Sequence, residues 1–240
     1  MTRFQPGDEV FGVGKGTFAE YAPAAENKLV PKPANLTFEQ AAVVAISGST
    51  ALQGLRDKGQ VRPGQKVLII GASGGVGTYA VQLAKAFGAE VTGVCSTTKV
   101  DLIRSMGADH VIDYTRNDFA DGKQRYDVIL DIGGNSSLSR LRRALAPKGT
   151  LVITGGETGG RWLGGTDRQL RALLLSRFVG QKLTTFVSTQ VLEDLIVLKN
   201  LIEAGKVTPV IDRAYPLAEA PEAIRYVEHG HARGKVVITV

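Results

Sequence analysis

The middle of the chain alternates short apolar runs with segments whose apolar residues recur at helical spacing. Within residues 78–87, for example, Ala80, Leu83, Ala84 and Phe87 recur at intervals of three and four. Runs typical of buried strands cover residues 67–70, 90–95, 110–114, 126–131, 149–154 and 182–188. Strands that alternate with helices in this way pair in parallel through right-handed crossovers. The pattern therefore predicts an α/β fold with a Rossmann doubly wound parallel sheet.

The two ends of the chain lack this rhythm. Short strand candidates, separated by turn residues, lie at 9–12, 17–22 and 27–30. Thr37 is expected to cap a helix that runs to Ile46, with Glu39 or Gln40 near the capping-box position. Ser49 and Thr50 are expected to cap a further helix. That helix and the later elements are placed at 51–58, 191–204, 218–228 and 235–240.

These patterns divide the chain into three expected parts. Residues 1–47 would form a partial β domain, because a few short strands cannot close a barrel and leave their edges unpaired. Residues 48–205 would form the dinucleotide-binding domain. Residues 206–240 leave the alternating rhythm, so we expect them to return to the β domain.

A glycine-rich turn follows the first buried strand. Val67–Ile70 leads into Gly71, Gly74 and Gly77, and a helical segment comes next. Glycines let the chain turn tightly and let a pyrophosphate approach the backbone, and the helix N-terminus offers free N–H groups and a positive dipole end. The order strand, glycine turn, helix predicts a dinucleotide site. Tight strand-to-helix turns also use glycine for structural reasons alone, and this reading stays open.

The residues that follow the second strand favour one nicotinamide cofactor. An Asp or Glu there would bind the ribose 2′-hydroxyl and repel a 2′-phosphate. This chain has Ser96, Thr97, Thr98 and Lys99 instead. Three hydroxyl groups and a cation suit a phosphate, so the sequence predicts NADPH. Ser and Thr are also good helix caps, and the two interpretations are compatible.

Composition narrows the class further. The 240 residues carry a net charge of +6, but the basic residues are scattered, so we expect no nucleic-acid partner. One cysteine allows neither an internal disulfide nor a thiolate zinc cluster. No span approaches the roughly 20 apolar residues of a membrane helix, and residues 1–8 hold no signal-peptide core. We therefore expect a cytoplasmic protein without a membrane partner.

Several motifs follow one another along the chain, at residues 6–12 (PGDEVFG), 18–22 (FAEYA), 41–52, 71–85 (GASGGVGTYAVQLAK), 107–114 and 230–235 (GHARGK). Together they resemble the zinc-independent quinone oxidoreductase branch of the medium-chain dehydrogenase/reductase superfamily. The resemblance implies a nucleotide-binding domain with a GroES-like β domain, here a partial one. It also implies hydride transfer from NADPH to a quinone or to the C=C bond of an α,β-unsaturated carbonyl. A homodimer through the nucleotide domain is a further implication.

The resemblance assigns cofactor contacts residue by residue. Those expected at the pyrophosphate are Ser73, Gly74, Gly75 and Val76. Those expected at the 2′-phosphate are Ser96, Lys99 and Tyr114. Those expected near the nicotinamide or its ribose are Thr50 and Gly133. A C-terminal loop that contacts the cofactor is expected at His231, Ala232 and Arg233. We expect no metal and assign no catalytic residue, since hydride transfer needs no enzymic nucleophile and solvent can supply the proton.

The chain departs from this family at its start. Full-length members carry the first part of the β domain before the motif at residues 6–12, whereas this chain begins almost on the motif. Our hypothesis is that Met1 is a late start and that the natural protein is longer. Two alternatives to an active reductase remain open. One is a shortened nucleotide-binding protein or sensor that binds NADPH without turnover, and the other is an interaction protein that keeps the fold as a scaffold.

Overall fold

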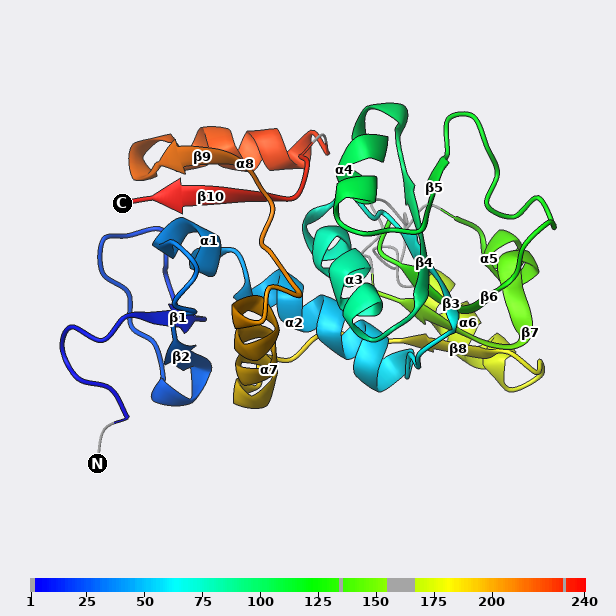
Figure 1. Ribbon diagram of the computed structural model, residues 1–240, viewed down its shortest axis with the longest axis horizontal. Coiled ribbons are helices and arrows are strands. Elements are labelled where there is room, and N and C mark those ends of the chain that lie inside the picture. Colours follow the sequence, from blue (N-terminus) through cyan, green and yellow to red (C-terminus); the bar gives the residue numbers. More distant parts are fainter. Residues whose placement is uncertain (1–2, 134–135, 155–166, 231) are drawn as a thin grey trace. The chain divides into compact units, whose positions relative to one another are not determined.

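The computed structural model describes residues 3–133, 136–154, 167–230 and 232–240. The chain divides into two compact units, shown together in Figure 1. Unit 1 combines Met1–Ser49 with Ser188–Val240, and unit 2 is Thr50–Val187. Residues 188–205, which the sequence pattern placed with the dinucleotide-binding part, belong to unit 1.

Unit 2 is built around one parallel sheet of six strands. Its strands are β3 (Lys66–Ile70), β4 (Glu90–Cys95), β5 (His110–Asp113), β6 (Tyr126–Asp131), β7 (Leu145–Ile153) and β8 (Lys182–Thr185). Their order is β5-β4-β3-β6-β7-β8, and every neighbouring pair is parallel. In chain order within the sheet this is 3-2-1-4-5-6, the order of the dinucleotide-binding fold. The predicted Rossmann doubly wound sheet is confirmed.

Helices cover the sheet because alternate residues of each strand present an apolar side chain to each face. The helices of unit 2 are α3 (Gly75–Ala86), α4 (Val100–Ser105), α5 (Leu138–Ala144) and α6 (Asp167–Ser176), with a 3₁₀ turn at Thr97–Lys99. Leu68 and Ile129 face a core that includes Leu141 of α5 and Ala172 of α6. On the other face, Ile103 of α4 lies against Gly93 of β4, where a Cβ atom would come within 2.5 Å of it.

Unit 1 has two small sheets and several helices. Its elements are β1 (Val10–Gly12), a 3₁₀ turn (Glu26–Lys28), β2 (Leu29–Pro31), α1 (Phe38–Ala42), α7 (Leu192–Glu203), β9 (Ile211–Pro216), a 3₁₀ turn (Leu217–Glu219), α8 (Ala220–Glu228) and β10 (Lys235–Thr239). β1 pairs with β2 in antiparallel fashion, and β9 pairs with β10 in parallel. The core of this unit contains Phe11 and Val30 from the first sheet and Leu198 and Ile202 from α7.

The predicted capping box is confirmed. The Thr37 hydroxyl accepts the N–H of Gln40, and the Gln40 side chain accepts the N–H of Thr37. The strand expected at 17–22 is wrong. Those residues have no strand partner, and Phe18 and Tyr21 are 61% and 90% exposed, so no neighbouring chain supplies the hydrogen bonds that a strand needs.

The helix expected to start after a Ser49–Thr50 cap is also wrong. Helix α2 runs from Ala45 to Gln53 and continues as a π-helical turn over Gly54–Lys58. Ser49 is buried inside α2, and a Cβ at Gly48 would lie 2.9 Å from Leu198. The small residues of this segment therefore allow close packing of a helix face rather than marking a helix start.

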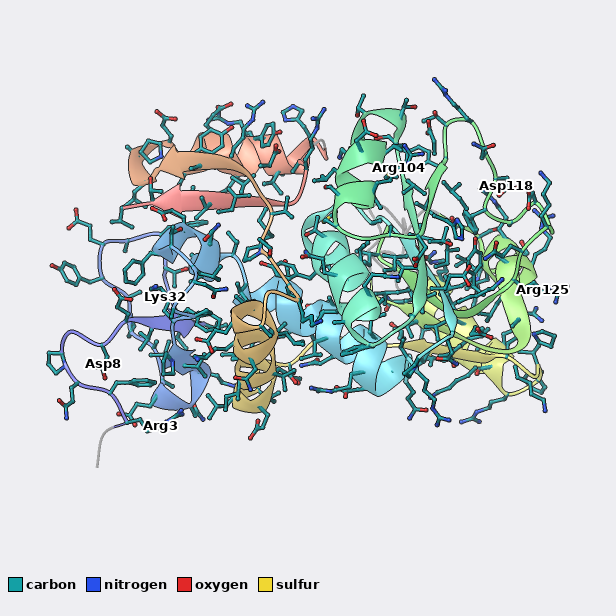
Figure 2. The ribbon with its side chains drawn as sticks, in the orientation of Figure 1. Arg3, Asp8, Lys32, Arg104, Asp118 and Arg125 are labelled. Carbon is teal, nitrogen blue, oxygen red and sulfur yellow. The ribbon has the colours of Figure 1, made fainter. Side chains whose placement is uncertain are left out.

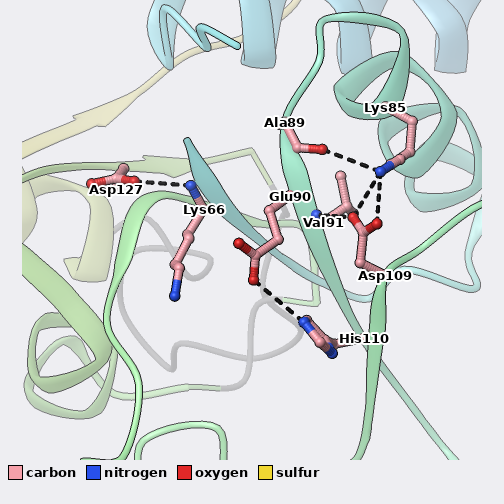
Figure 3. A network of polar contacts seen from close by, with 8 residues as sticks. All are labelled: Lys66, Lys85, Ala89, Glu90, Val91, Asp109, His110 and Asp127. Carbon is pink, nitrogen blue, oxygen red and sulfur yellow. Dashed lines mark hydrogen bonds and ion pairs between the residues drawn. The ribbon is translucent and has the colours of Figure 1, made fainter. Parts of the chain in front are cut away.

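Polar contacts join the amino ends of the parallel strands (Figure 3). Lys85 contacts both oxygens of Asp109 at 2.8 Å, and Asp109 accepts the N–H of Val91 at 2.7 Å. His110 and Glu90 lie 3.3 Å apart at the start of β5 and β4. These groups are partly exposed, so each contributes little stability on its own. They lie at the sheet edge opposite the carboxyl ends of the strands.

Candidate functional site at the carboxyl ends of the strands

The glycine turn after β3 contains two glycines that the fold itself requires. Gly71 has a φ of +84°, in the left-handed region that favours glycine. A Cβ at Gly77 would lie 2.1 Å from the Gly71 carbonyl oxygen and 2.6 Å from the Ala72 carbonyl carbon. Gly74 differs, because a Cβ there would approach nothing closer than that same Gly71 oxygen at 3.5 Å. The fold therefore does not explain glycine at position 74.

Helix α3 starts at this turn and presents its N-terminus. Gly74 is the N-cap residue and provides no side chain to cap the helix, while its carbonyl accepts the N–H of Thr78 at 3.0 Å. Gly75 and Val76 in the first turn are half-buried, and Ser73 just before them is buried. A helix start with free N–H groups and a positive dipole end can bind an anion. The expected pyrophosphate residues therefore lie together at one helix start.

The adjacent strand ends form the switch point of the sheet. The Ile70 carbonyl accepts the N–H groups of Ile132 and Gly133 at 3.0 and 3.2 Å. A Cβ at Gly71 would lie 3.0 Å from the Gly133 nitrogen. Gly133 thus lies directly beside the glycine turn, between β3 and β6, where the strand order reverses. In open α/β sheets, ligands bind in the crevice at this point.

The structure brings together the three residues expected at the 2′-phosphate. The Tyr114 N–H donates to the Cys95 carbonyl at 3.1 Å. This hydrogen bond holds the first residue after β5 beside Ser96. The Lys99 N–H donates to the Ser96 carbonyl at 3.0 Å. Tyr114 is 62% exposed, and Ser96 and Lys99 are half-buried. The site therefore combines one hydroxyl, one ammonium and one exposed aromatic ring at the ends of neighbouring strands.

A carboxylate at the end of β5 was missed by the sequence reasoning. Both oxygens of Asp113 accept hydroxyl groups, from Thr97 at 2.5 Å and Thr115 at 2.7 Å. The hydrogen bond from Thr97, with those from Thr115 and the nearby Arg116 cation, lowers the pKa of Asp113 below its ordinary value. The signal was an acidic residue that ends an apolar run, as Asp113 does in the printed sequence. This carboxylate orders the backbone beside Ser96.

The single cysteine, Cys95, ends the neighbouring strand β4 and pairs in register with Asp113. Burial and the Asp113 charge raise the pKa of Cys95 to about 11, although Lys99 and Arg104 act in the opposite direction. Figure 2 shows Arg104 on α4. Cys95 is therefore a protonated, buried thiol at neutral pH, and protonation makes a thiol a poor nucleophile. Among the described residues, no three His, Cys, Asp or Glu side chains cluster as metal ligands would.

The remaining expected contacts lie on other elements of the chain. Thr50 is half-buried within α2 instead of at a helix start. In unit 1, Asp212 Oδ2 accepts the N–H of Arg233 at 3.0 Å and the hydroxyl of Tyr226 at 2.7 Å, and Ala232 precedes this anchored residue. His231 lies outside the described residues. Within the described chain, no helix is long and apolar enough to span a membrane.

The strand order and its switch point define this protein as an α/β protein with the dinucleotide-binding fold. The family profile described as "Zinc-binding dehydrogenase" matches residues 106–238. The chain belongs to this family of the medium-chain dehydrogenase/reductase superfamily. The predicted resemblance is confirmed at that level.

Individual relatives carry names consistent with this family. The NAD(P)H oxidoreductase RTN4IP1 of Mus musculus, named as mitochondrial, is 38% identical over 99% of this chain. The NADPH-dependent alkenal/one oxidoreductase of Arabidopsis thaliana, named as chloroplastic, is 35% identical over 93% of it. The solved quinone oxidoreductase of Coxiella burnetii superposes with a TM-score of 0.88 at 28% identity and covers 100% of this chain and 74% of its own. The chain spans 65% and 53% of the lengths of the two curated relatives.

Proposed function

We propose that this protein is an NADPH-dependent oxidoreductase that delivers a hydride to a quinone or to the C=C bond of an α,β-unsaturated carbonyl. One observation carries the cofactor choice. The end of β4 presents Ser96 and Lys99 beside Tyr114, and it has no carboxylate at the position that would bind a ribose 2′-hydroxyl. The substrate class is supported by relatives named as a quinone oxidoreductase and an alkenal/one oxidoreductase.

The residues of unit 2 fit such a cofactor. Gly74 leaves open space where a side chain would otherwise stand, and the α3 N-terminus offers N–H groups to a pyrophosphate. Lys99 supplies positive charge for a 2′-phosphate, and Gly133 lets the backbone approach a ribose. When bound, a nicotinamide cofactor supplies the hydride. The protein binds and orients the cofactor and the substrate and excludes water from the reacting atoms. Solvent delivers the proton.

We further propose that the reaction needs no zinc, although the family description names that metal. The chain contains one cysteine, and Cys95 is buried with a raised pKa. Its three histidines are His110, His229 and His231. His110 contacts Glu90 at the amino end of the sheet, opposite the cofactor crevice. Activity should therefore be unchanged after dialysis against a chelator.

The position of β8 at the end of the sheet supports a proposed homodimer through unit 2. Among the described strands, β8 pairs with β7 alone. Leu170 and Leu174 on α6, which packs against β8, are exposed, as is Phe178 after it. Sedimentation velocity should give a dimer for the native chain and a monomer for Leu174→Glu. A cytoplasmic location stays a prediction, because the names of two relatives place them in organelles.

The decisive experiment is a fluorescence titration of the purified chain with NADPH and with NADH, followed by addition of a quinone or an enal. Tighter binding of NADPH and substrate-dependent oxidation support the proposal. Binding without oxidation selects the alternative of a nucleotide-binding sensor. A folded chain that binds neither cofactor contradicts both and leaves the scaffold alternative.

A further inference from the structure

A buried ion pair lies at the switch point and has no part in the interactions considered so far. Asp131 is the last residue of β6 and is fully buried. Arg168, in the first turn of α6, places its Nη1 atom 2.8 Å from Asp131 Oδ2, and its side chain is 9% exposed. Burying two charges is expensive unless they pair closely, so their location calls for an explanation.

The position of Asp131 in the sheet links it to the cofactor crevice. Asp131 pairs in register with Ile70, the residue directly before the glycine turn. The next two N–H groups along the chain, from Ile132 and Gly133, donate to the Ile70 carbonyl. The Asp131 carbonyl accepts the N–H of Thr154 at the end of β7. The backbone of Asp131 thus lies where the ends of β3, β6 and β7 meet, two residues before the expected nicotinamide-ribose contact, and its carboxylate contacts Arg168 of α6.

Arg168 also holds the backbone beyond Gly133. Its Nη1 atom donates to the Ser136 carbonyl at 2.7 Å. The same guanidinium therefore joins the strand end at Asp131 to the backbone just before α5. Arg168 therefore holds Asp131 and the Ser136 carbonyl in place. Its positive charge balances the negative charge of the Asp131 carboxylate.

We propose that Asp131 and Arg168 are a positioning and charge-balancing pair for the nicotinamide end of the cofactor site. This inference rests on the proposed function. The nicotinamide ring is neutral in NADPH and positive in NADP⁺, so an unbalanced charge near it would favour one form over the other. The pair keeps this end of the site close to neutral, and the two forms are then bound with similar affinity by the groups around the ring.

The test compares the dissociation constants of NADPH and NADP⁺ for four variants. The quantity compared is the ratio of the dissociation constant of NADPH to that of NADP⁺. Arg168→Met leaves a negative charge and should shift this ratio in favour of NADP⁺ binding. Asp131→Asn leaves a positive charge and should shift the ratio toward NADPH. Each shift should be on the order of tenfold, as expected for an unbalanced unit charge that acts through the protein interior. The double variant should return the ratio to within about twofold of the native value.

Lys85→Met is the matched control, because it breaks the Lys85–Asp109 ion pair at the opposite edge of the sheet. It should leave the ratio unchanged. A merely structural pair would weaken both cofactor forms equally, so shifts in the same direction, or none, would overturn the proposal. If one single variant fails to fold, the direction of the change in this ratio for the other single variant decides whether the proposal holds. If neither folds, the pair serves the fold and the proposal is overturned. A native chain that binds neither form contradicts the proposed function instead, and this is seen before any variant is compared.

Discussion

The two units of this protein use strands in opposite ways. In unit 2, six strands form one sheet, and four of them have a neighbour on both sides. Among the described residues of unit 1, four strands form two separate pairs, so each strand pairs along one edge. Isolated two-stranded sheets are marginal in water. Unit 1 therefore depends on its helices, and residues of α7 such as Leu195, Leu198 and Ile202 are fully buried.

The strands of the two units also differ in burial, since β9 of unit 1 has no buried residue. Around β1 of unit 1, Phe18, Tyr21 and Phe38 are exposed, and a cavity of about 580 Å³ is lined by residues of β1, α1 and β10. The central strands β3 and β6 of unit 2 are almost wholly buried. Local stability follows buried apolar area and protected hydrogen bonds. We therefore expect unit 1 to open at a lower free energy than unit 2.

The strongest way to break unit 2 is at its glycine turn. Gly77→Ala forces a Cβ into backbone atoms and should cost about 3 kcal/mol or more of unfolding free energy. Gly74→Ala is the matched control, because its φ of −83° suits alanine and its Cβ meets nothing closer than 3.5 Å. It should change stability by less than about 1 kcal/mol while weakening NADPH binding. Urea unfolding and NADPH titration measure the two effects. Equal destabilisation by both variants would contradict the distinction between Gly77, which the fold requires, and Gly74, which it does not.

Truncating one core side chain in each unit tests whether they unfold separately. Ile129→Ala in β6 and Leu198→Ala in α7 each remove a fully buried side chain, so each should cost about 2–5 kcal/mol. Amide hydrogen exchange should show faster exchange in α7 alone for Leu198→Ala. Ile129→Ala should increase exchange throughout the sheet of unit 2. Loss of protection in both units from either change would mean that they unfold as one.

A smaller effect, on cofactor affinity, distinguishes the carboxyl ends of the parallel strands from their amino ends. Lys99→Ala at the carboxyl edge should weaken NADPH binding roughly tenfold, because a charge-assisted contact to the 2′-phosphate is lost. NADH binding should not change. Lys85→Ala, at the amino edge, should leave both affinities unaffected. Parallel titrations measure this, and an equal loss of NADPH and NADH affinity in Lys99→Ala would contradict the assignment.

The smallest effects concern pH and compare one carboxylate from each unit. Hydrogen bonds from Thr97 and Thr115 lower the pKa of Asp113 in unit 2. Burial raises the pKa of Asp212 in unit 1, but hydrogen bonds from Tyr226 and the Arg233 N–H outweigh it, so the pKa is also lowered. A lowered pKa stabilises the fold above the ordinary value of 3.8, and this stability is lost as pH falls through the folded-state pKa.

Asp113→Asn and Asp212→Asn should therefore each reduce the loss of melting temperature below about pH 4. The Asp212 variant should affect the transition of unit 1, and the Asp113 variant that of unit 2. Melting curves at several pH values measure the difference between each variant and the native chain. A variant with the same acid dependence as the native chain would show that its carboxylate does not titrate as described.

The parts of the site whose residues lie within one continuous segment of the chain were the easiest to predict. The glycine turn and Ser96 with Lys99 occupy continuous segments, and each segment carries its own signal of strand end, turn and helix start. Asp113 and the Asp131–Arg168 pair were missed, because their roles depend on partners that lie far apart along the chain. Thr97 is 16 residues from Asp113, and Arg168 is 37 residues from Asp131.

The sequence by itself determined the alternation of strands and helices, and with it the parallel sheet and its switch point. Periodicity and glycine spacing act over a few residues, so one chain segment suffices to read them. Only the tertiary structure decided that residues 17–22 form no strand and that Gly48 and Ser49 lie inside a closely packed helix. Strand formation needs a partner edge and burial needs a neighbouring surface, and both come from distant parts of the chain.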